Sequence, residues 1–127
     1  MQRQTFSSNS IFEEEWRYKR AVKVGNTIYL SATGGWDYAA RTMPETATEQ
    51  ITQTFNNIEK ALSHFGASMS DLVQIQVIYR SQSVWDEILP ILTEYFKKSE
   101  PTAIAFEVPG VPDPRVLVEI VATAVVQ

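Results

Sequence analysis

The sequence lacks cysteine and contains a single histidine, His64. The lack of cysteine excludes disulfides, thiolate nucleophiles, iron–sulfur clusters and cysteine zinc sites. One histidine leaves no histidine-rich metal site, and no sequence neighbour would orient His64 for catalysis. Because it lies in the last turn of a predicted helix, we interpret His64 as a solvated helix-end residue.

Positive charge is also scarce, since 11 lysines and arginines stand against 15 aspartates and glutamates, a net charge of −4. An acidic chain is a poor electrostatic partner for a phosphate backbone, so we expect no nucleic-acid partner. Long apolar runs are lacking too, and Glu119 interrupts the longest one. No segment approaches the roughly 20 apolar residues of a membrane span, and no signal-peptide pattern follows Met1. The sequence therefore predicts a soluble cytoplasmic protein with no membrane partner.

What is present is typical of a folded domain. The chain has 127 residues, of which 44 % are apolar and 20 % are charged. This length matches one domain, and this composition excludes disorder and fibrous repeats. We therefore expect a single domain over residues 1–127.

Hydrophobic periodicity predicts two helices. The first begins at a capping box formed by Thr46 and Glu49, and its apolar stripe extends to Phe65, just before a glycine suited to the C-cap. The second begins at Ser83 and contains Pro90, which predicts a kink or a relaxed first turn.

β-rich runs predict the sheet. The predicted strands cover residues 22–24, 27–30, 72–79, 102–108 and 116–126. The first two form a hairpin about Gly25-Asn26, and residues 31–43 are predicted to form a loop. In the strand at 72–79, one face is expected to carry Val73, Ile75, Val77 and Tyr79.

The order of these elements predicts an α+β fold, a mixed β-sheet with both helices on one face. The strand at 116–126 is apolar on both of its faces. A two-layer monomer would leave one of these faces in water, and large exposed apolar patches usually mark interfaces. We therefore expect self-association through the uncovered face of the sheet.

Glu119 is the strongest candidate for chemistry because it interrupts a strand that is otherwise apolar on both faces. A buried carboxylate is costly without a partner. Glu119 is thus either an active-site acid/base or water-holding group with a raised pKa, or half of an ion pair at a subunit seam. Weaker candidates are Arg80, an edge charge or an anion clamp, and residues 16–18, a cleft wall or a loop anchor. The glycine pair in residues 33–36 is explained by backbone geometry.

Segments spread over nearly the whole chain follow one known pattern. They are Tyr18, Arg20-Ala21-Val22, Val24-Gly25-Asn26, Ile28-Tyr29, Ser31, Gln53 to Gly66, residues 67–79, Trp85, Tyr95-Phe96, Pro101, Glu107-Val108 and Val118-Glu119-Ile120. In these segments the chain resembles the Rid family, also called RidA/YjgF or L-PSP endoribonuclease-like. The resemblance implies a chorismate-mutase-like α+β fold and a homotrimer. In that family the sheets of three subunits form a central barrel, and small-molecule clefts lie between subunits.

The resemblance also implies an activity. Well-studied members hydrolyse imines and enamines such as 2-aminoacrylate to 2-keto acids and ammonia, without a cofactor, and some relatives have been described as ribonucleases or translation inhibitors. Tyr18, Ser31 and Glu119 stand at positions that match cleft residues, and Trp85 matches an aromatic bordering the cleft. We expect Glu119 to position water and the others to bind substrate.

Three positions depart from the family pattern. Ala103 occupies the place of the carboxylate-binding arginine, Leu89 replaces an asparagine, and the "S-G-q" loop contains Ala32 in place of glycine. The chain resembles the arginine-lacking subgroups more closely. We therefore expect a poor 2-aminoacrylate deaminase, or else a non-catalytic metabolite-binding or regulatory trimer. A substitute cation would have to come from Arg17, Arg20 or Arg80.

Overall fold

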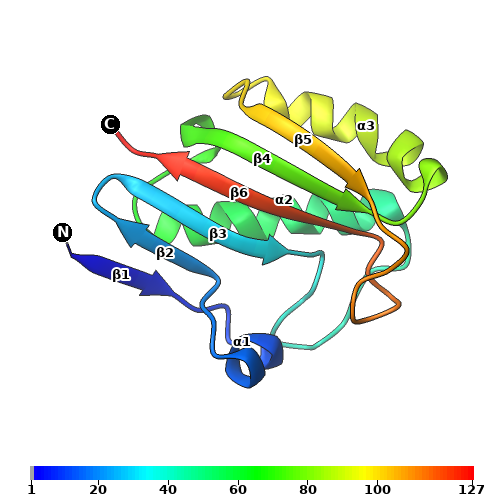
Figure 1. The fold of residues 1–127 in the computed structure, drawn as a ribbon, viewed down its shortest axis with the longest axis horizontal. Coiled ribbons are helices and arrows are strands. Elements are labelled where there is room, and N and C mark those ends of the chain that lie inside the picture. Colours follow the sequence, from blue (N-terminus) through cyan, green and yellow to red (C-terminus); the bar gives the residue numbers. More distant parts are fainter. Residues whose placement is uncertain (1) are drawn as a thin grey trace.

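The computed structural model describes residues 2–127 as a sheet with two long helices packed on one face (Figure 1). The strands are β1 (Arg3–Phe6), β2 (Ala21–Val24), β3 (Thr27–Thr33), β4 (Leu72–Tyr79), β5 (Thr102–Glu107) and β6 (Val118–Val125). The helices are α1 (Ile11–Trp16), α2 (Ala47–His64) and α3 (Gln82–Phe96), and the short 3-10 turn η1 (Met69–Asp71) precedes β4. The predicted α+β class and the placement of both long helices on one face are confirmed.

The sheet is mixed and has the order β1-β2-β3-β6-β4-β5. β4 and β5 run parallel, joined by a crossover through α3, while the other neighbouring strands are antiparallel. β6, the last strand in the sequence, lies in the middle of the sheet between β3 and β4 (Figure 1). This placement explains why β6 is rich in apolar residues, and it puts Glu119 at the beginning of a central strand.

The core lies between the sheet and α2 with α3. The predicted stripe of α2 is confirmed, since Ile51, Phe55, Ile58 and Leu62 are all 0 % exposed. The helix ends as expected, because Gly66 adopts the left-handed backbone, at φ 75°, that follows a helix. His64 is exposed at this end and packs beside Phe6 and Phe65, which confirms the prediction of a solvated helix-end residue.

The other face of the sheet is uncovered and apolar. Tyr29 (54 % exposed), Ile104 (52 %) and Phe106 (44 %) alternate along their strands with residues of the opposite face. Val121, on β6, lies on this face as well, because the buried Ile120 and Ala122 on either side of it point toward the helices. The two-faced apolar pattern of the last strand is therefore confirmed.

Several predicted boundaries are wrong. β1 and α1 were not predicted, because an exposed edge strand and a six-residue helix show no apolar periodicity. β3 continues through Ser31 to Thr33, where a loop was predicted. Helix α3 begins at Gln82 with Ser81 as its N-cap, and it runs through the exposed Pro90.

The facing of the predicted strand at 72–79 also needs one correction. Ile75 and Val77 are buried as expected, but Val73 is 42 % exposed and Leu72 is buried instead. The register against β6 shifts between Leu72 and Gln74, so a bulge reverses the facing at this end of the strand. β6 itself begins at Val118, two residues later than predicted.

Within residues 2–127, no helix combines the length and the apolar character that crossing a membrane requires.

Candidate functional site

A cavity of about 370 Å³ lies where β3 ends and β6 begins. Its walls come from α1, from the segment leading into β2, and from the loops that follow β3 and precede β6. Five aromatic side chains line it, namely Phe12, Trp16, Tyr18, Trp36 and Tyr38. Aliphatic groups of Val111, Pro112 and Val116 complete a largely apolar wall.

Four of the predicted site residues meet in this cavity. Tyr18, Ser31, Ala32 and Glu119 all line it, although they are spread over about a hundred positions of the sequence. The Ser31 hydroxyl donates to the carbonyl of Lys19 (2.6 Å), which ties β3 to the segment that carries Tyr18. The cleft-wall interpretation of residues 16–18 is thereby favoured over a simple loop anchor, since Trp16 also lines the cavity.

Two predicted site residues lie elsewhere in the chain. The Trp85 ring packs against Tyr79, with ring centroids 5.0 Å apart, and does not reach the cavity. Ala103 is exposed on β5, opposite Ile75 of β4. A cleft role for Trp85 and Ala103 stays a prediction, because it requires a neighbouring subunit to present them.

Glu119 is the one acidic side chain of the cavity that has no partner among residues 2–127, since it forms no hydrogen bond or ion pair there. It is half-buried, on the face of β6 away from the helices. Burial raises the pKa of Glu119, and the positive charge of Arg20 offsets this increase only in part. An ion pair of Glu119 within the chain is thus excluded for the described residues.

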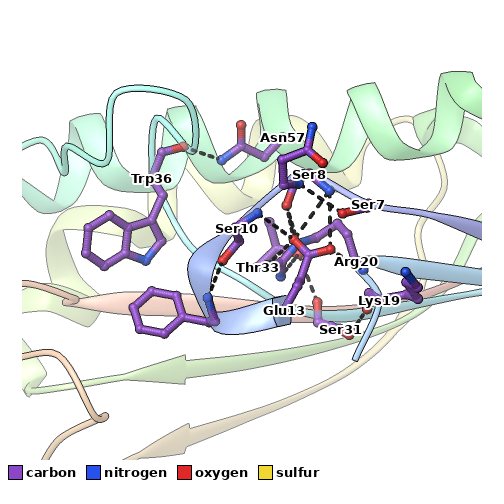
Figure 2. A network of polar contacts seen from close by, with 12 residues as sticks. Ser7, Ser8, Ser10, Glu13, Lys19, Arg20, Ser31, Thr33, Trp36 and Asn57 are labelled. Carbon is purple, nitrogen blue, oxygen red and sulfur yellow. Dashed lines mark hydrogen bonds and ion pairs between the residues drawn. The ribbon is translucent and has the colours of Figure 1, made fainter. Parts of the chain in front are cut away.

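Arg20 lies beneath the cavity in a network of buried polar groups, which Figure 2 shows around the Glu13 carboxylate. Its Nη2 lies 3.3 Å from Glu13 Oε2, and both side chains are almost fully buried. Its Nη1 donates to the Ala32 carbonyl (2.7 Å), and its Nε donates to Ser8 Oγ (3.2 Å). Burial alone would raise the pKa of Glu13, but the Ser8 hydrogen bond and the Arg20 charge outweigh it and lower that pKa.

This network determines whether Arg20 is free to bind a substrate carboxylate in place of the family's carboxylate-binding arginine. All three side-chain nitrogens of Arg20 donate to protein acceptors, and the residue is 2 % exposed. Arg20 therefore cannot form a bidentate hydrogen bond with a substrate carboxylate. Arg80 donates to the Pro114 carbonyl (3.0 Å) and supports the loop before β6. Arg17 is exposed, and neither Arg17 nor Arg80 lines the cavity.

Helix α2 fixes both loops that wall the cavity. The buried Gln50 donates from Nε2 to the carbonyls of Pro44 and Arg115 (2.8 Å each), and its Oε1 accepts from the Leu117 amide (2.8 Å). Asn57 donates to the carbonyls of Gly34 and Trp36 (2.9 Å each; Figure 2). Sequence reasoning missed these residues, and the only available signal was a polar position beside the apolar stripe of α2.

Backbone geometry explains the glycine at position 35, as the sequence suggested. A Cβ at this position would lie 2.7 Å from the Gln50 carbonyl oxygen, which is backbone and cannot rotate away. Only glycine therefore lets the loop approach α2 closely enough to seat Trp36 in the cavity wall.

Comparison with known proteins decides the family. The model of the family described as "Endoribonuclease L-PSP" matches residues 9–126. The chain belongs to this family, the Rid or YjgF family. It is 32 % identical to a RutC family protein from Pyrococcus abyssi over 84 % of each chain. A 2-iminobutanoate/2-iminopropanoate deaminase from Dermatophagoides farinae is 31 % identical over 66 % of each chain.

Solved structures agree with this assignment. A YjgF/YER057c/UK114 family member from Mycobacterium tuberculosis matches with a TM-score of 0.89 at 30 % identity, covering 98 % of this chain and 100 % of that one. YyfA from Yersinia pestis matches with a TM-score of 0.86 at 21 % identity, covering 98 % of this chain and 100 % of that one, and shows the shared fold. The predicted chorismate-mutase-like α+β fold is confirmed.

The cavity of this Rid-family chain offers acid–base groups rather than metal ligands. Within residues 2–127, no three histidine, aspartate or glutamate side chains gather in a way that would hold a metal ion. Burial raises the pKa of Tyr38 to about 12 and also raises that of Tyr18, so both phenols stay protonated and can donate hydrogen bonds at neutral pH. Of the two carboxylates that line the cavity, Asp113 is paired with Arg115, and Glu119 has no ion-pair partner among residues 2–127.

Proposed function

We propose that this protein hydrolyses a small imine or enamine, with Glu119 positioning the attacking water. The observation that carries the proposal is the unpaired, half-buried Glu119 in an apolar cavity beside Tyr18 and Ser31. The similarity to an imine deaminase supports the reaction class. An enzyme of this kind needs a carboxylate whose pKa lies closer to neutral than usual, and burial supplies that.

The chemistry requires only water and one carboxylate. Water adds to the carbon of the C=N bond while Glu119 accepts one of its protons. Glu119 passes this proton to nitrogen, which gives a carbinolamine. Glu119 then accepts the hydroxyl proton of the carbinolamine and transfers it to the same nitrogen as the C–N bond breaks, so the products are a carbonyl compound and ammonia or an amine. An enamine first shifts a proton to carbon to become the imine, and Tyr18 or Ser31 can hold the substrate in place during both steps.

We further propose a homotrimer in which the uncovered sheet faces meet. Tyr29, Ile104, Phe106 and Val121 provide an apolar surface suited to such an interface. In this arrangement a neighbouring subunit presents β5, and with it Ala103, to the cavity. The small-molecule cleft therefore lies between subunits.

The protein is proposed to be a poor 2-aminoacrylate deaminase. Ala103 cannot grip a substrate carboxylate as an arginine does, and a charge-assisted hydrogen bond contributes about 1.5–3 kcal/mol. The test couples a dehydratase that generates 2-aminoacrylate to the detection of pyruvate. Acceleration equal to that of an arginine-bearing relative would contradict this part of the proposal.

The reaction class is tested separately with a panel of imines that lack a carboxylate, by following the release of ammonia or amine. Turnover of at least one panel member that Glu119→Gln abolishes is the expected result. The second candidate, a non-catalytic metabolite-binding or regulatory trimer, is favoured by Ala103. It would be supported if panel members raise the melting temperature without being consumed. Ribonuclease activity is not proposed, because the net charge is −4 and Glu119 adds negative charge to the cavity.

A further inference from the structure

Among the charged residues that line the cavity, Glu119 alone lacks an ion-pair partner within residues 2–127. Arg20 is matched by Glu13 at 3.3 Å. Asp113 accepts two hydrogen bonds from the Arg115 side chain, from Nε (3.1 Å) and Nη2 (2.9 Å). Glu119 has no such partner among residues 2–127, so ionised Glu119 leaves the cavity with one uncompensated negative charge.

The walls suit a cation as well. Arg20 lies over the Tyr38 ring at 4.8 Å and over the Tyr18 ring at 5.7 Å. Arg115 lies over the Trp36 ring at 4.8 Å, so three rings of the cavity already hold a guanidinium. The rings of Phe12 and Trp16 remain for the positive charge of a ligand, and Trp16 is 63 % exposed. Aromatic faces attract cations within about 6 Å, most strongly where water is excluded.

From these two features we propose that the cavity selects a cationic nitrogen compound with an apolar or aryl substituent and no carboxylate, such as the protonated form of a cyclic or aryl imine. The cationic nitrogen lies beside Glu119, and the apolar part lies against Phe12, Trp16 and Tyr18. This inference rests on the proposed function and names its substrate class.

Among residues 2–127, those that line the cavity offer a ligand carboxylate no free positive charge. Arg20 is engaged by Ala32, Ser8 and Glu13, and Arg115 is held by Asp113. Glu119 would repel the carboxylate at short range. The same groups that favour a cation therefore disfavour a zwitterion or an anion.

The test compares three probes of nearly the same shape by isothermal titration calorimetry at mildly alkaline pH. N-methyl-3,4-dihydroisoquinolinium carries a fixed positive charge, its 1-carboxylate adds the anionic group, and 1,2-dihydronaphthalene is neutral. We expect the cation to bind at least about tenfold more tightly than either of the others, which corresponds to about 1.4 kcal/mol. Glu119→Gln should remove about that preference while leaving affinity for the neutral probe unchanged.

A matched control is Glu94→Gln, which makes the same chemical change at an exposed carboxylate on α3 and should alter no affinity. Equal or tighter binding of the carboxylate probe would overturn the inference, and so would an unchanged preference in Glu119→Gln. If Arg115→Gln then abolished binding of the carboxylate probe, Arg115 would be identified as the clamp. Binding of the cation without turnover of any imine would leave this inference standing and contradict the proposed hydrolysis.

Discussion

At the scale of single residues, burial of the Glu119 charge lowers the stability of the folded state. The side chain is half-buried, and Arg20 compensates its charge only in part because Glu13 already neutralises that arginine. A group that destabilises the fold and lies in a cavity is more simply explained by function than by structure. Its two acidic neighbours differ, because Glu13 and Asp113 both have pKa values lowered by hydrogen bonds and arginine partners.

Glu119→Gln should therefore raise stability at neutral pH. The folded-state pKa of Glu119 lies above its ordinary value of 4.5, so the folded state binds a proton that the unfolded state has released. The cost is absent below about pH 4.5 and is complete once the pH exceeds the folded-state pKa. Tyr18, Arg20, Tyr38 and Asp113 also line the cavity, and of these only Asp113 titrates in the acid range.

The measurement is the melting temperature of the wild type and of Glu119→Gln across the pH range. The variant should melt higher near pH 7, and the difference should vanish toward pH 4. A variant that melts lower than the wild type at neutral pH would show that Glu119 is paired in the assembled protein. That result would favour the ion pair at a subunit seam.

Glu13→Gln should have the opposite effect. The pKa of Glu13 is lowered, so its stabilisation is present above the unfolded-state value of about 4.5 and is lost as the pH falls through the folded-state pKa. The variant leaves Arg20 buried without its counter-charge, which typically costs about 3–5 kcal/mol. Urea unfolding at neutral pH measures this loss, with Glu14→Gln on the exposed side of α1 as the control. A loss below about 1 kcal/mol would contradict the assigned role of the pair.

At the scale of helices and strands, the elements with a periodic apolar pattern could be predicted from the sequence. The short helix that forms part of the cavity wall could not. The stripe of α2, the hairpin at Gly25 and the two-faced β6 follow from periodicity and turn chemistry, and all were confirmed. α1 supplies Phe12 and Trp16, but its six residues are too few to show a period.

Some residues of the candidate site were predicted from the sequence, and others were not. Glu119 was named because it interrupts an apolar strand, and Tyr18 and Ser31 were named through family resemblance. The structure brings all three together. Trp36 and Tyr38 were not named, because they lie in a loop whose path depends on Gln50 and Asn57 of α2. Contacts between a loop and a distant helix leave no local pattern in the sequence.

Gly35→Ala tests how closely this loop must approach α2. The added Cβ would lie 2.7 Å from the Gln50 carbonyl oxygen, so the loop must move, and overpacking of this kind costs about 1–3 kcal/mol. Gly34→Ala is a matched control, since its Cβ would meet only side-chain atoms at 3.4 Å or more. The free energy of unfolding, measured by chemical denaturation, should fall in Gly35→Ala and change little in Gly34→Ala. The affinity for the cationic probe should also fall in Gly35→Ala. Equal effects of the two variants would contradict the role given to Gly35.

At the scale of the whole molecule, we expect the uncovered sheet face to form the interface of the proposed trimer. Phe106→Lys places a charge on this face and should convert the proposed trimer to a folded monomer. Val118 and Ile120 would be poor choices, because both point into the core and a lysine there would unfold the chain. Ile11→Lys, at 36 % exposure on α1, is the control that should leave the trimer intact. Light scattering measures the mass, and a monodisperse wild-type monomer would contradict the trimer.

Assembly also determines whether position 103 belongs to the site. Ala103 and Ala105 are both exposed on β5 and share the sheet face of Ile75 and Val77. Only a neighbouring subunit can bring one of them to the cavity, because neither lines it within the chain. In the proposed trimer this residue is Ala103, which matches the family's carboxylate-binding arginine, and Ala105 lies two residues further along the same strand.

Ala103→Arg should therefore provide the carboxylate-binding arginine that the wild type lacks. A new charge-assisted hydrogen bond to the substrate contributes about 1.5–3 kcal/mol, so pyruvate formation from 2-aminoacrylate should rise by about tenfold to a hundredfold. The same variant should bind the 1-carboxylate probe more tightly, which reverses the selectivity of the wild type. Ala105→Arg adds an identical charge to the same exposed strand and should do neither. If both variants gained activity equally, the added charge would act at long range and Ala103 would lie outside the site.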